Sequence, residues 1–442
     1  MRTVCKTVCT LLLLAAILTA NAATVSIDCT DRTSLAGIID ETTTDLTLTG
    51  CAQPSLLNQI TELAPSLQNL DMKDLQLTPP VVPSYAFATS DIRSINLPDN
   101  LTGIGEAAFA GASIMSIHLP HGVDSIAPHT FSRCTSLASV DMPGVSSIGR
   151  KAFAGCKALQ TINYPATLTH IGEEAFTTSA IVRADLTQCK GLDKIGDFAF
   201  ASCSNLVHVS LPTHIINIGE GAIMNCPRLT TIDGQDCLTA IPDLMLASDA
   251  ALLSADIVAA SPVESVGDYS FSGAGSITHL TLPPTLSVVG NHAMERMSGL
   301  RTIDAENLAD VPDIGNDVWD LTPQNSITLK ANPQTAQKFK NAPQWCEFNI
   351  TDGTASGINS PETQTGITLA FEGNAMRIRS CRPVAGVTVR DLQGRLRSDV
   401  DGINSCDALV DTSSWNADGL YIVIIHTSNT TETRQIIRQT KR

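Results

Sequence analysis

Phenylalanine recurs in this chain at a nearly constant spacing, and this regularity constrains the fold more than any other feature. Between Phe87 and Phe200, successive members of the series lie 22, 22, 22, 23 and 24 residues apart. Seven of the eleven phenylalanines share this position of a repeating unit, and Ile223, Leu246 and Met294 continue the series. The seven are Phe87, Phe109, Phe131, Phe153, Phe176, Phe200 and Phe271. Such a repeat predicts stacked coils that bury their apolar faces only against neighbouring coils.

Other positions recur in phase with this Phe column. An Ile-Gly or Val-Gly pair precedes the column position, as at Ile148-Gly149. Cysteine follows that position by three residues in four units, after Phe in three of them and after Ile223 in the fourth. A segment L-x-x-I-x-L-P comes next, as in residues 137–143. Its alternating end predicts a short strand, which proline ends because it cannot donate a ladder hydrogen bond. We expect the Ile-Gly segment to form the return side, with glycine allowing a turn. The A-F-x-x-C segment is expected to form a short helical turn with its Phe and Cys pointing inward.

The sequence therefore predicts a repeat solenoid, mainly β with short helical turns, followed by a small all-β sandwich. Alternating apolar residues in the last segment predict the sandwich strands, and a Thr-, Ser-, Gly- and Asn-rich stretch before it predicts a linker. Trp345 and Phe348 are expected to cover the last coil within a closing strand-helix-strand unit, with binding of a ligand by these aromatic side chains as the alternative. The expected parts are an N-terminal cap with irregular first coils (24–85), the repeats (86–315), a C-terminal cap (316–350), the linker (351–365) and the sandwich (366–442).

Residues 1–23 have the features of a secretory signal peptide. Arg2 and Lys6 precede a short apolar run at residues 11–18, and Ala20-Asn21-Ala22 has the small-x-small form of a cleavage site. The apolar run is too short to span a bilayer, which requires about 20 residues. We therefore expect an exported protein with no transmembrane segment.

The chain has 13 cysteines, of which Cys5 and Cys9 lie in the expected signal peptide. Four others follow the Phe column, and we interpret them as buried thiols that behave as small hydrophobic side chains. Disulfides remain an alternative for these, because neighbouring coils are close enough to be bridged. A disulfide between Cys29 and Cys51 in the cap is a further alternative. The four column cysteines are Cys134, Cys156, Cys203 and Cys226.

The charge of the chain excludes one class of partner. Acidic residues number 44 against 28 basic ones, for a net charge of −16. A nucleic-acid-binding protein needs a basic surface, so we predict no nucleic-acid partner. Residues 355–442 are nearly neutral, so the acidic excess lies in the preceding part of the chain.

The sequence contains no strong catalytic motif. Gly103-x-Gly105-x-x-Ala108 superficially matches a dinucleotide-binding pattern, but Gly105 and Ala108 are repeat positions and no βαβ unit surrounds them. His118 and His121 have no third metal ligand in phase with them. We therefore predict no enzyme activity, no cofactor and no metal site.

Candidate binding residues come from the strand positions that flank the buried aliphatic residue. Strand alternation directs these side chains outward. The expected surface is lined by hydroxyl groups with acidic rungs, and Asp233 and Asp256 are expected to be strand neighbours. Solvation alone explains polar residues at these positions, and recognition of a partner is the alternative. The candidate partner-binding residues are Asp141, Asp185, Asp233, Asp256, Asp304, Arg183, His208 and His279.

The complete repeat I-G-x-x-A-F-x-x-C-x-x-L-x-x-I-x-L-P recurs nearly whole at residues 148–165 and 195–212. It resembles the BspA-like branch of the leucine-rich repeats, a family of bacterial and protist surface proteins. The resemblance implies a cell-surface or extracellular protein that mediates adhesion to a protein partner on host or neighbouring cells. A glycan-binding accessory protein is the alternative, although both outward rows lack the aromatic residues on which sugars stack.

The last segment has a second resemblance. The segment Val389-Arg-Asp391-Leu-Gln-Gly394, then Trp415, then Asp418-Gly419-Leu-Tyr421 and a basic C-terminus resemble the sorting domain of the type IX secretion system of Bacteroidetes. The resemblance implies that residues 366–442 engage a secretion machinery at the outer membrane. A plain C-terminal β module is the alternative.

Overall fold

The computed structural model describes most of the chain from residue 23 onward. Residues 1–22, Asp256 and most of the expected linker lie outside the described part, so the expectations placed on them remain predictions. The described residues are 23–234, 238–254, 262–353, 367–372, 374–391, 393–413, 415, 419–427 and 431–438.

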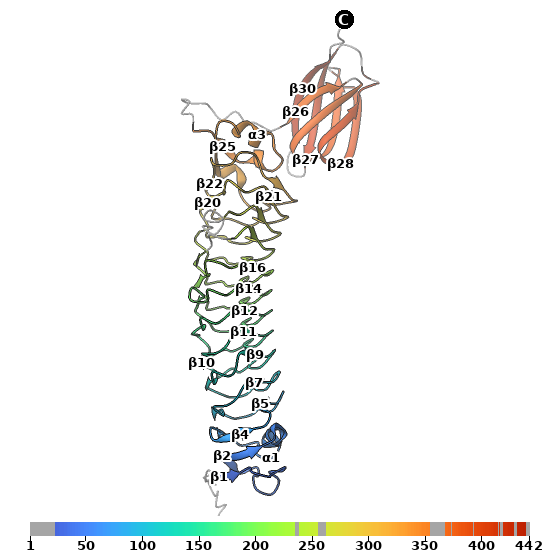
Figure 1. The fold of residues 1–442 in the computed structure, drawn as a ribbon. Helices are drawn as coiled ribbons and strands as arrows, with labels where there is room; N and C mark the ends of the chain where they lie inside the picture. Colours follow the sequence, from blue (N-terminus) through green and yellow to red (C-terminus); the bar gives the residue numbers. More distant parts are fainter. Residues whose placement is uncertain are drawn as a thin grey trace, which may run out of the picture.

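The repeats stack into a β-solenoid with two rows of parallel strands. Figure 1 shows the coils rising in a nearly straight column from the N-terminal strands to the C-terminal cap. The first row comes from the segments around the Ile position of I-x-L. In most of its strands this aliphatic residue is buried and at least one residue beside it is exposed. Its strands are β1 (Ala23–Asp28), β2 (Thr43–Ala52), β3 (Asn69–Asp71), β6 (Ser94–Asn96), β8 (Ser116–His118), β10 (Ser139–Asp141), β13 (Arg183–Asp185), β15 (His208–Ser210), β17 (Thr231–Asp233), β20 (His279–Thr281), β22 (Thr302–Ala305), β24 (Thr328–Ala331) and β25 (Asn349–Thr351).

The second row is the return side predicted from the Ile-Gly segments. Its strands pair in parallel, with the order β16-β14-β12-β11-β9 in the largest of these sheets. The strands are β5 (Val81–Val82), β7 (Gly103–Ile104), β9 (Ser125–Ile126), β11 (Ser147–Ile148), β12 (His170–Ile171), β14 (Lys194–Ile195), β16 (Asn217–Ile218), β18 (Ala240–Ile241), β19 (Ser265–Val266), β21 (Val288–Val289) and β23 (Asp313–Ile314). Strand β4 (Leu75–Leu77) pairs instead with the end of β2 in the first row.

The segment around each Phe differs from the helical turn expected from the sequence. It consists of consecutive tight turns, in which the residue two before the Phe has a left-handed backbone, as Ala107 does with φ 53°. Alternation of right- and left-handed residues points successive N–H groups in different directions. Ala110 N donates within its own coil to Ala107 O at 3.0 Å, whereas Phe109 N donates to Thr130 O of the next coil at 2.9 Å. The corners of the solenoid are therefore hydrogen-bonded from coil to coil, which a helix would prevent.

The glycine after each return strand serves close packing between coils. At Gly149, a Cβ atom would lie 2.7 Å from Ile126 O and 2.8 Å from Pro128 N of the preceding coil. Its φ is not left-handed, so the turn geometry expected from the sequence is not what requires glycine here. Only a residue without a side chain lets the two backbones approach so closely.

The core of the solenoid contains the stacked Phe column. From Phe87 to Phe200, rings of neighbouring coils are nearly parallel with centroids 5.2–5.5 Å apart. The interpretation of the cysteine column as buried thiols is confirmed, because all four are buried and free. Cys29 and Cys51 are free as well, so the structure contains no cap disulfide between them.

Irregular elements close both ends of the stack. At the N-terminal end, η1 (Pro54–Gln59) and α1 (Ile60–Leu63) replace the tight turns of the regular coils. The C-terminal end includes η2 (Gln324–Ser326), α3 (Ala336–Asn341) and η3 (Trp345–Glu347). Strand β24, helix α3 and strand β25 form the expected strand-helix-strand unit. Trp345 packs edge-on against Trp319 and Phe339, and its burial assigns it to packing rather than to a ligand.

The C-terminal segment forms an antiparallel sheet with a separate core. The long strand β27 (Ala375–Asp391) pairs with β26 (Thr368–Glu372), β28 (Leu396–Asp411) and β29 (Gly419–Thr427), and β29 pairs with β30 (Thr431–Arg438). The expected all-β character is confirmed, but the described strands form one connected, barrel-like sheet (Figure 1). Irregular pairing in the middle of β27 allows its two halves to contribute to different sides of the unit.

Candidate interaction surface

The outward residues of the first strand row form a continuous polar surface, which we call the strand face. In β8, for example, Ile117 is buried, whereas Ser116 and His118 are exposed. The same alternation holds in β10 and β13, where Asp141, Arg183 and Asp185 are exposed. The outward strand residues of the described coils from β6 to β24 include no Phe, Tyr or Trp.

Cross-strand register brings the first acidic candidate beside a histidine. Asp141 of β10 lies opposite His118 of β8. His118 Nδ1 and Asp141 Oδ2 are 2.7 Å apart, and both side chains are about two-thirds exposed. His118 therefore has a defined role on the strand face that its spacing from His121 did not suggest.

His208 is the most buried of the candidate side chains, and its ring contacts residues of its own strand and of the next strand. Its neighbours in register are Arg183 of β13 and Thr231 of β17. The ring hydrogen-bonds Thr231 Oγ1 through Nδ1 and Ser210 Oγ through Nε2, the latter at 2.8 Å. Nε2 also lies 3.1 Å from Asp233 Oδ2. Only 15% of the His208 side chain is exposed. This imidazole therefore holds the neighbouring polar groups in place and leaves little of its own surface for a partner.

His279 repeats this arrangement three coils further along. Its Nδ1 lies 2.6 Å from Thr302 Oγ1 of the next strand, and its Nε2 lies 3.1 Å from Thr281 Oγ1 of its own strand. These two hydroxyls occupy the positions that Thr231 and Ser210 occupy around His208. Unlike His208, His279 is exposed.

Two aspartates at strand ends are partly engaged by their own turns. Asp185 Oδ1 accepts hydrogen bonds from the hydroxyl of Thr187 at 2.6 Å and from its backbone N–H at 3.1 Å. The hydroxyl contributes most to lowering the pKa of Asp185. Asp304 Oδ1 similarly accepts from Glu306 N at 3.0 Å. In each carboxylate, Oδ1 accepts the hydrogen bonds of the turn, so Oδ2 is left for other contacts.

The acidic rungs of the described strands alternate with other residues. Asp185 and Asp233 are separated by Ser210 in the register of β13, β15 and β17. Asp304 lies between Thr281 and Lys330. The expected pairing of Asp233 with Asp256 lies outside the described residues. Residues 161–163 have no strand assignment, so the row is divided between β10 and β13.

Sequence reasoning missed one charged residue of the strand face. Lys330 lies on β24, opposite Asp304 of β22, and is exposed. The segment Ile327-Thr328-Leu329 identified a strand of the C-terminal cap, but not that this strand continues the repeat row. Counting one repeat onward from Asp304 would have placed Lys330 at the equivalent position.

The strand face offers polar groups along its whole length. Within the ranges that the structure describes, no group of three or more His, Cys, Asp or Glu side chains is arranged to hold a metal ion. No described helix is both long and apolar enough to cross a membrane. The strand face combines exposed carboxylates, imidazoles, hydroxyls and the cations of Arg183 and Lys330, which suits many weak polar contacts along a rigid surface.

Comparison with known families and structures agrees with the repeat. A family model described as BspA type leucine rich repeat region matches in six copies over residues 66–181, 142–252 and 251–356. No curated protein sequence matches the chain.

Solved structures also show similarity to the chain. A leucine-rich repeat protein from Bacteroides ovatus is 17% identical, with 71% of this chain and 84% of that one aligned and a TM-score of 0.51. A leucine rich cell surface protein from Faecalibacterium prausnitzii is 24% identical, with 63% and 82% aligned and a TM-score of 0.36. The pneumococcal vaccine antigen PcpA is 13% identical, with 75% and 88% aligned and a TM-score of 0.37. The first of these likenesses shows a shared fold.

Proposed function

Because the chain belongs to the BspA-type leucine-rich repeat family, we propose that it is an exported surface protein whose strand face binds a protein partner on host or neighbouring cells. The family model describes a repeat scaffold, and no enzyme family is indicated. Binding by such a scaffold needs no catalytic group, since affinity comes from the sum of polar contacts over several coils.

One observation carries this proposal. The strand face presents charged and hydroxyl side chains in register over several coils, without an aromatic residue among the described outward positions. Sugar recognition commonly uses aromatic faces, whereas complementary charges give protein partners their specificity and fast association. This composition favours a protein partner over a glycan.

The test uses a triple variant, Asp141→Asn, Asp233→Asn and Asp304→Asn. A matched control, Asp124→Asn, Glu173→Gln and Asp193→Asn, makes the same charge change at exposed residues beside the return strands. Attachment of the purified protein to intact cells is measured before and after the cells are treated with protease. We expect several-fold weaker attachment for the strand-face variant only, and loss of attachment on protease-treated cells. Equal attachment by both variants would refute the proposed role of the strand face.

We further propose that residues 366–442 direct sorting to the cell surface. The support is the motif resemblance together with an antiparallel sheet that has its own core, separate from that of the solenoid. Deletion of residues 366–442 should leave the folded repeats inside the outer membrane. Normal surface display of the truncated chain, measured by antibody labelling of intact cells, would contradict this role.

A further inference from the structure

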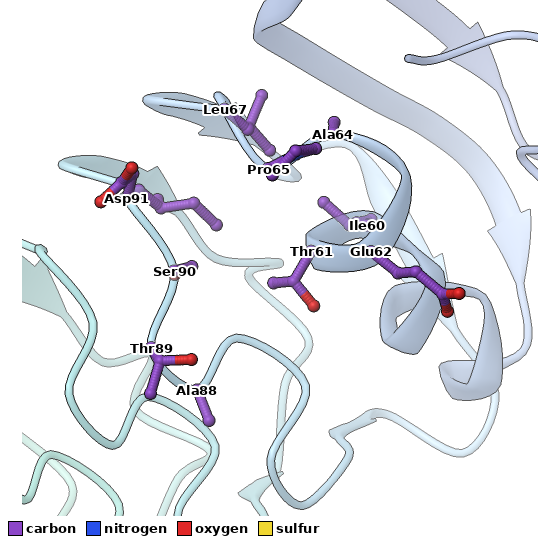
Figure 2. A pocket seen from close by; sticks show the side chains of 11 residues that line it. Ile60, Thr61, Glu62, Ala64, Pro65, Leu67, Ala88, Thr89, Ser90 and Asp91 are labelled. Atoms are coloured by element: carbon purple, nitrogen blue, oxygen red, sulfur yellow. The ribbon is translucent and has the colours of Figure 1, made fainter. Parts of the chain in front are cut away.

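A cavity opens where the irregular N-terminal coil meets the first regular coil. Its volume is about 390 Å³, and it lies between helix α1 with the residues after it and the facing segment of residues 88–92. Figure 2 shows the side chains of Thr61 and Thr89 pointing into the space between these two segments, with Glu62 and Asp91 at opposite sides. The cavity lies at a corner of the solenoid, outside the strand face.

The cavity exists because the coil-to-coil hydrogen bonding of the corners stops at this point. In regular coils, the residue after the Phe accepts from the preceding coil, as Ala110 O does from Thr89 N at 2.7 Å. Ala88 is the equivalent residue in the first regular coil. Helix α1 occupies the preceding coil in place of the tight turns, and among the described residues no backbone N–H donates to Ala88 O. The repeat geometry directs this carbonyl toward the preceding coil, on the side of the cavity.

Every polar side chain that lines the cavity can accept a hydrogen bond, and none carries a positive charge. The carboxylates of Glu62 and Asp91 are exposed, and the hydroxyls of Thr61 and Thr89 have no hydrogen-bond partner among the described residues. No lining residue is Lys, Arg or His, and Arg93 follows the lining segment without being part of it. The remaining wall is apolar, from side chains such as Ile60 and Leu67. A ligand that combines an aliphatic stem with a cationic group carrying several donors would complement these groups.

We propose that this cavity binds an arginine side chain of a partner protein. A guanidinium has five N–H donors and a fixed positive charge, and its aliphatic stem suits the apolar wall. A lysine ammonium has three donors, fewer than the separate acceptor groups around this cavity. The cavity volume falls in the range of about 300–1,000 Å³ typical of ligand sites, so one side chain fits. The arginine site is separate from the strand face. An experiment can therefore refute one of the two proposed binding roles without refuting the other.

The probe is N-acetyl-arginine amide, compared with its neutral isostere N-acetyl-citrulline amide. Methyl resonances of Ile60, Leu67 and Ala88 report occupancy of the cavity in the full-length protein. We expect saturable shifts with a dissociation constant in the millimolar range, as suits a single side chain, and at least about tenfold weaker binding of citrulline. Equal binding of the two probes, or no shifts up to about 50 mM, would overturn the proposal.

Two variants test the same site. Glu62→Gln with Asp91→Asn removes both charges, and we expect arginine binding to weaken at least about fivefold. Asp74→Asn with Asp99→Asn is the matched control, because both residues are exposed and neither lines the cavity. Thr89→Arg places a cation at the cavity and should abolish binding. The fold tolerates this change, since Arg133 and Arg296 occupy the equivalent position with left-handed φ values of 60° and 56°.

Three results would contradict the assignment. If the double charge variant bound N-acetyl-arginine amide as tightly as the parent, the carboxylates of Glu62 and Asp91 would have no role in binding. Unchanged binding by Thr89→Arg would place the probe elsewhere. Agmatine binding more than about tenfold tighter than N-acetyl-arginine amide would assign the cavity to a free small molecule rather than to a protein side chain. The strand-face triple variant should bind arginine normally, which separates this proposal from the proposed function.

Discussion

The thiol of Cys156 donates a hydrogen bond to the carbonyl oxygen of Phe131, one coil earlier, across 3.2 Å. The other column cysteines make the same contact with the Phe of the preceding Phe-containing coil, at 2.9–3.3 Å. The two most regular columns of the sequence are therefore linked. Phe fills the core, and the small thiol behind it donates a hydrogen bond to a backbone carbonyl that in most of these coils also accepts from a backbone N–H, without adding bulk.

We predict that the column cysteines are unreactive in the folded protein. Burial raises the pKa of Cys134 to about 12 and that of Cys203 to about 11, and a thiol reacts as its thiolate. Cys51 is exposed and should be modified by iodoacetamide first. Mass spectrometry of native and urea-unfolded protein measures this order. Labelling of Cys134 as fast as Cys51 in the native state would contradict the burial of the column.

The second prediction concerns the glycine of the return strands. In Gly149→Ala, the new Cβ would meet Ile126 O and Pro128 N at 2.7 and 2.8 Å, both of them backbone atoms that cannot move away independently. We expect the free energy of unfolding to fall by about 1–3 kcal/mol. Gly191→Ala is the control, because its Cβ would meet only Thr169 Cγ2 at 3.5 Å. Urea denaturation measures both, and equal stability of the two variants would contradict the close-packing role.

The repeat was predictable because the same residue types recur in the sequence at a nearly constant spacing. Spacing of Phe, Ile-Gly and I-x-L was sufficient to place the two strand rows and the core, since each coil obeys the same packing rule. The backbone of the corner was not predictable, because an A-F-x-x-C segment also suits a helical turn. The hydrogen bond from Phe109 N to the next coil favours tight turns over a helical turn, and it joins residues about 20 positions apart.

The candidate site was predictable in part for a related reason. Strand alternation correctly placed Asp141, Arg183 and Asp185 on an exposed surface. It did not predict that His208 is largely buried beside two hydroxyl groups, because these come from two strands that the sequence alone does not place in register. The cavity beside Ala88 has no sequence signature of its own. It arises because helix α1 replaces the tight turns in one coil, whereas the regular coils keep these turns and their coil-to-coil hydrogen bonds.

A third prediction follows from the aspartate in the cysteine column. Asp249 occupies the position three residues after Leu246 and is fully buried. Its Oδ1 accepts from Cys226 N at 2.6 Å, and its Oδ2 has no hydrogen-bond partner among the described residues. Burial raises the pKa of Asp249 well above its usual value. The folded state then binds a proton more tightly than the unfolded state, so this group lowers stability increasingly as the pH rises above about 4.

Asp249→Asn removes this cost while keeping an acceptor for Cys226 N. We expect the variant to be more stable than the parent by about 1 kcal/mol or more at pH 7, with a smaller difference at pH 5. Urea midpoints at the two pH values measure the difference. The buried-acid interpretation fails if the advantage of Asn is as large at pH 5 as at pH 7.

The last prediction concerns Asp391 in the turn that joins β27 and β28. Burial alone would raise its pKa, but hydrogen bonds from Arg395, Arg397 and Gln393 lower it to about 2. Oδ2 lies 2.7 Å from Arg395 Nε and 2.8 Å from Arg397 Nη2. The stabilisation from a lowered carboxyl pKa is complete above the unfolded value of about 3.9 and is lost as the pH falls toward 2.

Asp391→Asn should therefore loosen the C-terminal sheet at pH 7 and have little effect near pH 2. Hydrogen exchange of peptides from β27 and β28 in the full-length chain measures this locally, and peptides from β11 and β14 of the solenoid provide the internal control. Asp407→Asn is the matched variant, because Asp407 also pairs with arginines but is about half exposed, so its exchange effect at pH 7 should be smaller. Equal effects of the two variants on hydrogen exchange would mean that burial and the added backbone donors do not make Asp391 more stabilising than Asp407.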